Sequence, residues 1–225
     1  RELETWNYVA DTRALGPAIW LRWFELYRAQ VWDDEWKSRG IEQPGGSWGF
    51  SGGKHREGEE GGVACLTREF PNPIWFDDRN TAGRESRTDL ARRSFALAIT
   101  SLKKQFGDDL EKWRWGNINQ LEVRSLTQMP ELSRNGGPTV GTEFTVNPGS
   151  NVGPVGGGAS WRMIVDFGHL DQSVGVYPGG QSENPESPHY DDQMRLWATG
   201  QYVPLNMVSD AKKLPAQAKV KTMSF

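Results

Sequence analysis

A stripe of large apolar residues at helical spacing is the first pattern in the chain. Its members recur at intervals of four, three and four residues: Trp20, Phe24, Tyr27 and Val31. Such spacing places them on one face of a helix, and Pro17 suits a first helical turn, where its missing N–H costs nothing. We predict a helix from about residue 16 to residue 36 whose aromatic face packs into a core rather than forming a ligand platform. Arg22, Glu25 and Arg28 are expected largely on its other side.

A second helix is predicted from about residue 82 to residue 106. Four side chains mark its apolar face: Leu90, Leu97, Leu102 and Phe106. Gly107 stands where a helix C-terminus is commonly capped. The basic residues of this segment are interpreted as a solvated helix face rather than a polyanion-binding patch: Arg84, Arg87, Arg92, Arg93, Lys103 and Lys104. Beyond the helix, Trp113 and Trp115 would point to opposite faces of an extended backbone.

The C-terminal half carries strand signals. Residues 160–167 and 173–177 are predicted to be paired strands, because the short segment between them suits a hairpin loop. Polar and apolar residues alternate over 142–146, and a flexible piece is expected from 147 to 158. A closing helix is expected to begin near Tyr190 and to end at Gly200. The segment after it, from Tyr202, is interpreted as an exit segment.

Helices that come first and strands that come later, without βαβ alternation, favour an α+β class over a doubly wound parallel sheet. We treat residues 1–225 as one segment, with 1–140 mainly helical and 141–225 carrying antiparallel strands and the closing helix. Residues 40–70 interrupt the helical part with pairs of glycines and a charged run. They lack the Gly-Lys-Ser/Thr ending of a phosphate loop, so we expect a long exposed loop of the kind that serves as a lid or binding element.

Composition narrows the classes of function. The chain has 29 acidic and 26 basic residues and a net charge of −3, which argues against a strongly basic nucleic-acid binder. Nucleic acid is therefore not expected as a partner. No run approaches the ~18 apolar residues of a membrane helix, so a membrane is not expected as a partner either. A single cysteine, Cys65, excludes an internal disulfide and a cysteine-based zinc cluster. Eleven tryptophans and 26 glycines are typical of a loop-rich globular protein with large aromatic anchors.

One group of residues has the composition of a serine triad. Ser182 and His189 are seven residues apart across two prolines, and Asp191 and Asp192 follow. That separation says nothing about their geometry. Turn and capping hydrogen bonds explain these residues better, with both aspartates in the first turn of a helix.

Other polar groups have ordinary interpretations too. His169 and His189 match no metal-ligand spacing, so no metal site is expected in this chain. The pairs Asp33–Asp34 and Asp77–Asp78 offer carboxylates of the kind a glycosidase uses, but neighbours in sequence rarely converge at the required separation. Asp108–Asp109 is typical of a helix boundary.

The run Gly179–Gln193, which reads GGQSENPESPHYDDQ, carries the most specific signal in the chain. Together with Leu196-Trp197 and residues 200–205, it resembles the C-terminal end of the β chain of the penicillin acylase (penicillin amidase) family of N-terminal-nucleophile hydrolases. Residues 75–78, 113–116 and 157–167 fit the same family in the same order, so the resemblance covers roughly residues 1–208. The motif positions are expected to be structural: Gly180, Gln181, Ser182, Ser187, Pro188, His189, Tyr190, Asp192, Gln193 and Trp197.

Two positions depart from the family pattern. Members commonly have a histidine three residues after the Trp-Gly pair, where this chain has Asn119. Glu183 replaces a glycine that is usual in the motif. A different local turn is expected there, since glycine alone adopts positive φ freely.

The resemblance implies the C-terminal fragment of an αββα sandwich hydrolase that is made as a precursor and cleaves itself into two chains. A serine at the new N-terminus attacks an amide carbonyl with its own α-amine as base, and the products are a carboxylic acid and an amine. In the family that serine, the oxyanion-hole residues and the calcium ligands lie upstream of the matched region. The resemblance thus implies that this chain has no catalytic residue or cofactor of its own and is inactive alone. Calcium belongs to the full-length enzyme.

Its expected partners are the α chain, the N-terminal part of the β chain and a small amide. The sequence does not distinguish which amide is the substrate, and the resemblance allows β-lactam antibiotics, acyl-homoserine lactones and lipopeptides. A periplasmic or extracellular location is implied by the resemblance only.

An alternative from another class is a non-catalytic, tryptophan-rich binding or structural module. That interpretation requires two or three exposed tryptophans in a coplanar row. The hydrolase interpretation predicts instead that most tryptophans are buried or face parts of the enzyme outside this chain. It also predicts that the chain, as part of a longer precursor, exposes an apolar patch.

Overall fold

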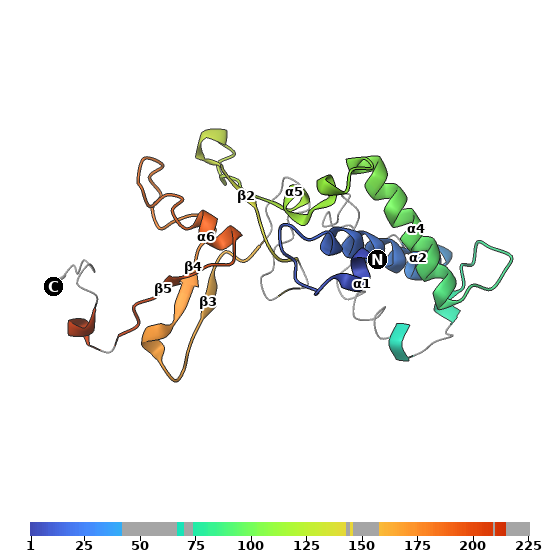
Figure 1. Ribbon diagram of the computed structural model, residues 1–225, viewed down its shortest axis with the longest axis horizontal. Helices are drawn as coiled ribbons and strands as arrows, with labels where there is room; N and C mark the ends of the chain where they lie inside the picture. Colours follow the sequence, from blue (N-terminus) through green and yellow to red (C-terminus); the bar gives the residue numbers. More distant parts are fainter. Residues whose placement is uncertain (42–66, 70–73, 143–144, 146–157, 209, 215–225) are drawn as a thin grey trace.

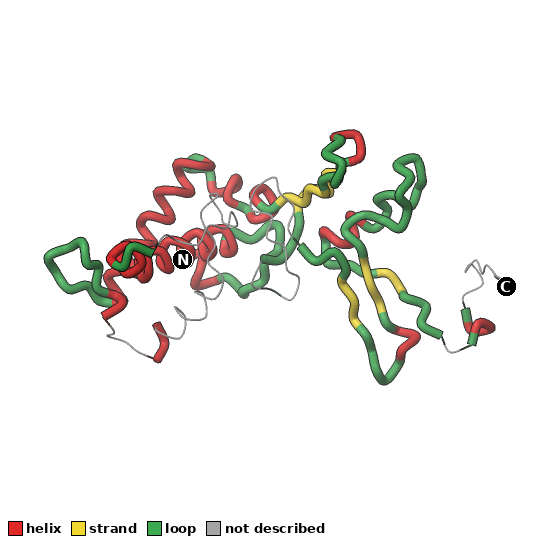
Figure 2. The backbone as a smooth tube through the Cα atoms, turned by 180° about the vertical axis from the view of Figure 1, so that it is seen from behind, coloured by secondary structure: helices red, strands yellow, loops and turns green. Residues whose placement is uncertain are grey.

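The computed structural model describes residues 1–41, 67–69, 74–142, 145, 158–208 and 210–214. A helical part formed by the N-terminal half and a part with two small sheets lie next to each other along the long axis (Figure 1). The view from behind shows the same division, with the chain crossing between the two parts near strand β2 (Figure 2). This mixture of helices and antiparallel sheets confirms the α+β class. The αββα sandwich stays a prediction.

Two long helices form the centre of the helical part. Helix α2 spans Gly16–Ser38 and packs against helix α4, which spans Arg87–Phe106 (Figure 1). The predicted first helix is confirmed, and Tyr27 and Val31 of its apolar stripe are buried. The stripe was wrong at Trp20, which is 36% exposed. Arg22 and Arg28 are buried as well, contrary to the expectation that they face away from the core. Arg22 is accommodated because its guanidinium donates to the hydroxyl of Ser101 on α4 at 2.6 and 2.9 Å.

Helix α4 begins five residues later than predicted because Ser86 and Asp89 form a capping box at its start. The buried face of α4 follows an i, i+4 row: Leu90, Ser94, Ala98 and Leu102. The expected apolar face was wrong at Leu97, which lies at the edge of that row and is 47% exposed. Gly107 ends the helix as predicted, with φ of 82° and its N–H bonded to the carbonyl of Lys103.

Short elements complete the helical part. They are α1 (Glu2–Thr5), the 3-10 turns η1 (Ile74–Phe76) and η2 (Leu110–Trp113), and α5 (Trp115–Ile118). Trp113 and Trp115 are both buried in one apolar cluster with Leu102 and Ala18. They do not point to opposite faces, because the backbone at this point forms helical turns and is not extended.

The second part contains two antiparallel sheets. Strand β1 (Gln120–Val123) pairs with β2 (Arg134–Pro138), a hairpin that the apolar pattern did not reveal. Strands β3 (Arg162–Ile164) and β4 (Val174–Val176) form the predicted hairpin in shorter form. Strand β5 (Val203–Pro204) pairs with β4, so the expected exit segment is the third strand of this sheet.

Helix α6 (Met194–Ala198) packs on this second part and contributes Trp197 to a cluster with Leu121 and Val176. It begins four residues after the predicted start, while Gly200, with φ of 72°, follows its end as expected. The 3-10 turns η3 (Pro130–Leu132), η4 (Leu170–Gln172) and η5 (Ala211–Lys213) lie in the connections.

Some predictions lie wholly or mostly outside the described residues. They are the loop at 40–70, the strand at 142–146 and the flexible piece at 147–158. Thr142 and Thr145, which are described, are not in a strand. Within the described part of the chain, no helix is long and apolar enough to cross a bilayer.

Candidate functional site

The segment that carries the resemblance, residues 178–193, forms a closed loop between β4 and α6 (Figure 1). The N–H of Gln193 donates to the carbonyl of Gly179 at 3.0 Å, and its side-chain oxygen accepts from the N–H of Tyr177 at 3.0 Å. Closer to the tip, the N–H of Ser182 donates to the carbonyl of His189 at 3.1 Å. These bonds tie the two arms of the loop together.

The same loop holds the β1–β2 hairpin. The hydroxyl of Tyr190 donates to the carbonyl of Leu132 at 2.6 Å. Arg134 of β2 donates to a carboxylate oxygen of Asp191 at 2.7 Å, and its guanidinium lies 4.6 Å from the centre of the Tyr190 ring. An ion pair and a cation–π contact on one arginine fix its side chain more firmly than either would alone.

Glycine at position 180 has a steric cause. A Cβ at this position would stand 2.0 Å from the carbonyl oxygen of His189, inside any allowed contact distance. At the neighbouring Gly179 a Cβ would lie 3.6 Å from the nearest described atom, which is an ordinary contact. The loop therefore requires glycine at 180 and tolerates a side chain at 179.

The turn around Glu183 does not use a left-handed residue, in line with the replacement of the usual glycine by glutamate. Glu183 is exposed and does not have positive φ. The hydroxyl of Ser182 accepts from the N–H of Asn184 at 3.2 Å, and the side chain of Asn184 accepts from the N–H of Glu186 at 3.0 Å. Side-chain-to-backbone bonds of this kind form turns without a left-handed residue.

The structure joins only two of the three members of the triad candidate. The Nδ1 atom of His189 lies 2.8 Å from a carboxylate oxygen of Asp192, and both side chains are well exposed to solvent. No hydrogen bond among the described residues joins the hydroxyl of Ser182 to the His189 ring. Ser187 accepts from the N–H of His189 at 3.1 Å, a turn bond of the kind expected.

The helix-capping role expected for the two aspartates was wrong. Asp191 and Asp192 precede α6, whose first residue is Met194, and neither side chain caps it. Instead, Asp191 forms an ion pair with Arg134, and the carboxylate of Asp192 lies beside the His189 ring. Gln181 and Pro188 are exposed at the surface of the loop.

Trp197 of α6 covers a buried arginine that the sequence analysis missed. The guanidinium carbon of Arg162 lies 3.6 Å from the centre of the Trp197 ring, and Nη1 donates to the Trp197 carbonyl at 2.7 Å. The Nε and Nη2 atoms are buried and have no hydrogen-bond partner among the described residues. Burial lowers the pKa of Arg162 to about 10, against a small opposing effect of Tyr202. An arginine inside an apolar strand segment was the signal available in the sequence.

Asn119, which stands where the family commonly has histidine, is fully buried. Its amide nitrogen donates to the carbonyls of Thr139 and Gly141 at 3.1 and 3.3 Å. Its side-chain oxygen has no hydrogen-bond partner in the part of the chain that the structure describes. The residue connects the end of α5 to the segment after β2, a structural position away from solvent.

Residues of both acidic pairs belong to one network of ion pairs and hydrogen bonds. The N–H of Arg79 donates to Asp34 at 2.9 Å, and the Arg79 guanidinium donates to Glu35 at 2.8 Å. Arg39 donates to the other oxygen of Glu35 at 2.8 Å. Asp78 accepts from Arg93 of α4 at 3.0 Å. Because each carboxylate is already bonded, the group is an ion network that holds residues 77–86 to both long helices, and it lacks the free acid of a glycosidase.

The electrostatics of this network favour ionised acids. Burial by itself would raise the pKa of Glu35, but hydrogen bonds and positive charge from Arg79 and Arg39 outweigh it and lower that pKa. Asp78 behaves alike: burial raises its pKa, and bonds from Asn80 together with the charge of Arg93 bring it below the ordinary value.

Metal binding has no support in the described part of the chain, which contains no group of three or more His, Cys, Asp or Glu side chains able to hold an ion. His169 is exposed and lies 3.4 Å from Asp166 alone. The calcium that the resemblance implies for the whole enzyme therefore finds no ligand set in these residues.

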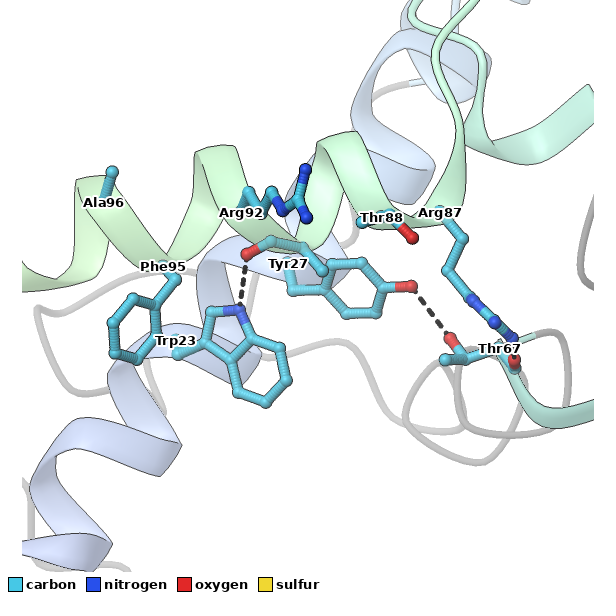
Figure 3. A pocket seen from close by; sticks show the side chains of 9 residues that line it. Trp23, Tyr27, Thr67, Arg87, Thr88, Arg92, Phe95 and Ala96 are labelled. Atoms are coloured by element: carbon cyan, nitrogen blue, oxygen red, sulfur yellow. Dashed lines mark hydrogen bonds between the residues drawn. The ribbon is translucent and has the colours of Figure 1, made fainter. Parts of the chain in front are cut away.

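A pocket of about 440 Å³ opens between α2 and α4 (Figure 3). Trp23 of α2 and Phe95 of α4 lie at one end, with their rings in an edge-to-face arrangement 6.3 Å apart. Tyr27, Thr67 and Arg87 lie at the other end. No sequence pattern pointed to this pocket, because it is formed by two helices far apart in the chain.

The tryptophans that the structure describes do not form the exposed row that a binding module requires. Trp20, at 36%, is the most exposed tryptophan that the structure describes, and Trp113, Trp115 and Trp197 are buried. Most of the other described tryptophans are half-buried, so burial of most tryptophans is not observed, and the described tryptophans also give no support to the binding module.

Comparison with known proteins agrees with the motif. The family model described as penicillin amidase matches residues 1–213. The chain is 33% identical over 141 residues to the acyl-homoserine lactone acylase QuiP of Pseudomonas syringae pv. syringae (strain B728a), which covers 58% of this chain and 17% of that protein. It is 30% identical over 157 residues to QuiP of Pseudomonas aeruginosa (strain PAO1), covering 59% and 18%.

A third relative, QuiP of Pseudomonas fluorescens (strain Pf0-1), is 32% identical over 139 residues, which cover 60% of this chain and 17% of the relative. The chain thus matches roughly a sixth of the length of these curated relatives. The family model, by contrast, matches nearly all of this chain. The chain belongs to the penicillin amidase family, a family of hydrolytic enzymes.

Proposed function

We propose that the protein containing this chain hydrolyses the amide of N-acyl-homoserine lactones to a carboxylic acid and a homoserine lactone amine. The observation that carries this proposal is the family match over residues 1–213, together with relatives that are named acyl-homoserine lactone acylases. β-Lactam antibiotics and lipopeptides are the competing substrate classes within the resemblance.

Within that enzyme, residues 1–225 are the C-terminal segment of the β chain, and the nucleophile belongs to another part. In support, no described serine hydroxyl is hydrogen-bonded to a histidine ring. An N-terminal serine needs no histidine, because an α-amine has an ordinary pKa near 8 and can accept the hydroxyl proton at working pH. Self-cleavage of a precursor is the step that creates such an amine.

The role proposed for this chain is to stabilise the frame around the site. The loop at residues 178–193 connects β4, α6 and the β1–β2 hairpin by hydrogen bonds at both of its arms. A frame held in this way limits the movement of neighbouring strands, which catalysis by precise positioning requires. The motif residues are therefore proposed as structural.

The upstream part of the protein is the proposed partner, and it completes the αββα sandwich. The hairpin at residues 163–170 exposes four apolar side chains: Met163 (51%), Ile164 (54%), Phe167 (90%) and Leu170 (48%). It projects away from the body of the chain (Figure 1). Apolar groups in such numbers on one projection favour burial by another segment. A periplasmic or extracellular location is proposed on the family resemblance alone.

The full-length protein, expressed with its upstream sequence, provides the test. It is incubated with N-decanoyl-homoserine lactone and separately with benzylpenicillin, and the released primary amine is measured. We expect amine release from the lactone and none from residues 1–225 alone. Amine release from benzylpenicillin only would replace the proposed substrate class. Hydrolysis by residues 1–225 alone would contradict the assignment of the nucleophile to another part.

A further inference from the structure

The pocket between α2 and α4 has an apolar end and a polar end. Trp23 and Phe95 lie at the apolar end with their rings in an edge-to-face arrangement (Figure 3). Ala91 and Ala96 of α4 also line the pocket. The indole nitrogen of Trp23 donates to the carbonyl of Ala91 at 3.1 Å, so the ring is held in place and does not swing into the space.

The polar end carries hydroxyl groups and positive charge. The hydroxyls of Tyr27 and Thr67 lie 2.9 Å apart, and the guanidinium of Arg87 donates to the carbonyl of Thr67 (Figure 3). Arg92 lies on the same helix at the rim of the pocket and is exposed. Two arginines and no carboxylate belong to the lining, so the pocket has a net positive charge.

We propose that this pocket binds an aliphatic carboxylate, with its chain against Trp23 and Phe95 and its carboxylate at Arg87 and Arg92. A volume of about 440 Å³ falls within the range of about 300–1,000 Å³ that small-molecule sites occupy. Apolar burial favours the chain, and the planar guanidinium favours the carboxylate over an alcohol or an ammonium head.

The inference goes beyond the proposed hydrolysis. The lining contains neither histidine nor carboxylate beside its two threonines, so it has no base to activate a hydroxyl. The pocket is a binding site and not a second catalytic centre. A carboxylate with an apolar chain has the chemistry of the acid that the proposed reaction releases. Its binding to the pocket can be measured without any hydrolysis.

Titration calorimetry on the full-length protein tests the proposal with three probes of equal chain length: decanoate, decanol and decyltrimethylammonium. We expect decanoate to bind, decanol to bind at least about tenfold more weakly, and the ammonium not to bind. Equal affinity for decanoate and decanol would overturn the role of the arginines. Absence of decanoate binding would overturn the site.

Two variants locate the binding. Ala96→Phe fills the pocket from an exposed helical position, and Arg92→Gln removes one charge at the rim. Each is expected to weaken decanoate binding about tenfold or more. Ala82→Phe and Arg195→Gln make the same changes at exposed positions outside the lining, and they are expected to leave the affinity unchanged. Unchanged affinity in both pocket variants would show that decanoate binds elsewhere.

Discussion

Glu35 is an acidic residue whose role depends on its neighbours in space. Its side chain is only 2% exposed, and its two oxygens accept one bond each from Arg39 and Arg79. The sequence places it beside the Asp33–Asp34 pair without distinguishing it, since burial depends on which segment packs over α2. That segment, around Arg79, lies more than forty positions away along the chain.

Replacing this carboxylate tests the ion network. Glu35→Gln keeps the shape but removes the charge, so two arginines lose a charged acceptor, and we expect unfolding to require about 2 kcal/mol less. The arginines are nearly half exposed and can rehydrate, which keeps the loss below that of a fully buried pair. Urea unfolding measures the difference. Glu183→Gln, at an exposed position, is the control, and an equal loss in both variants would argue against the network.

The network also predicts how stability depends on pH. The folded pKa values of Glu35 and Asp78 lie below their ordinary values of 4.5 and 3.8. Below those ordinary values the unfolded chain therefore binds more protons than the folded one, and stability falls as the pH decreases towards the folded values. Above them the contribution is fully present.

Urea unfolding between pH 7 and pH 3 is the measurement. We expect a plateau near neutrality and a loss of stability below about pH 4.5, with a shallower loss in Glu35→Gln. A variant that loses stability as steeply as the unaltered protein would show that Glu35 contributes nothing to the acid sensitivity.

Among the elements, the long helices and the β3–β4 hairpin were predictable, and strands β1, β2 and β5 were not. α2 and α4 each span several turns, so the apolar spacing typical of a helix repeats several times in each. Pro17 and Gly107 additionally mark a helix start and a helix end. Strands of two to five residues, such as β1 and β5, have too few positions to show alternation. They form because a partner strand lies beside them.

The loop at residues 178–193 gives a prediction at this scale. Gly180→Ala places a Cβ against the carbonyl of His189, so the two arms must separate, and we expect a loss of about 2 kcal/mol or more in stability. Gly179→Ala meets only an ordinary contact and is the matched control. Urea unfolding compares the two. Equal effects would show that the loop yields easily and does not hold the hairpin.

At the scale of the whole molecule, the apolar hairpin at residues 163–170 makes the proposed assembly testable. Phe167→Ser removes a ring that is 90% exposed in this chain. If the upstream part of the protein covers it, the full-length protein loses about 2 kcal/mol of stability. Leu126→Ser changes a residue that is 100% exposed outside the hairpin, and it is expected to have little effect. Thermal unfolding of the two full-length variants measures the difference. A Phe167→Ser protein with unchanged stability would argue against burial of the hairpin.

The sequence by itself determined the class of fold, the two long helices, the β3–β4 hairpin and the family. These depend on local periodicity or on a long specific motif, and both are properties of residues close together in the chain. The tertiary structure alone decided which charged residues are buried, among them Arg162 and Glu35, and which helices form a pocket. The physical reason is that burial and pocket shape depend on contacts between segments distant in the chain. The residue pattern of one segment does not indicate which other segment packs against it.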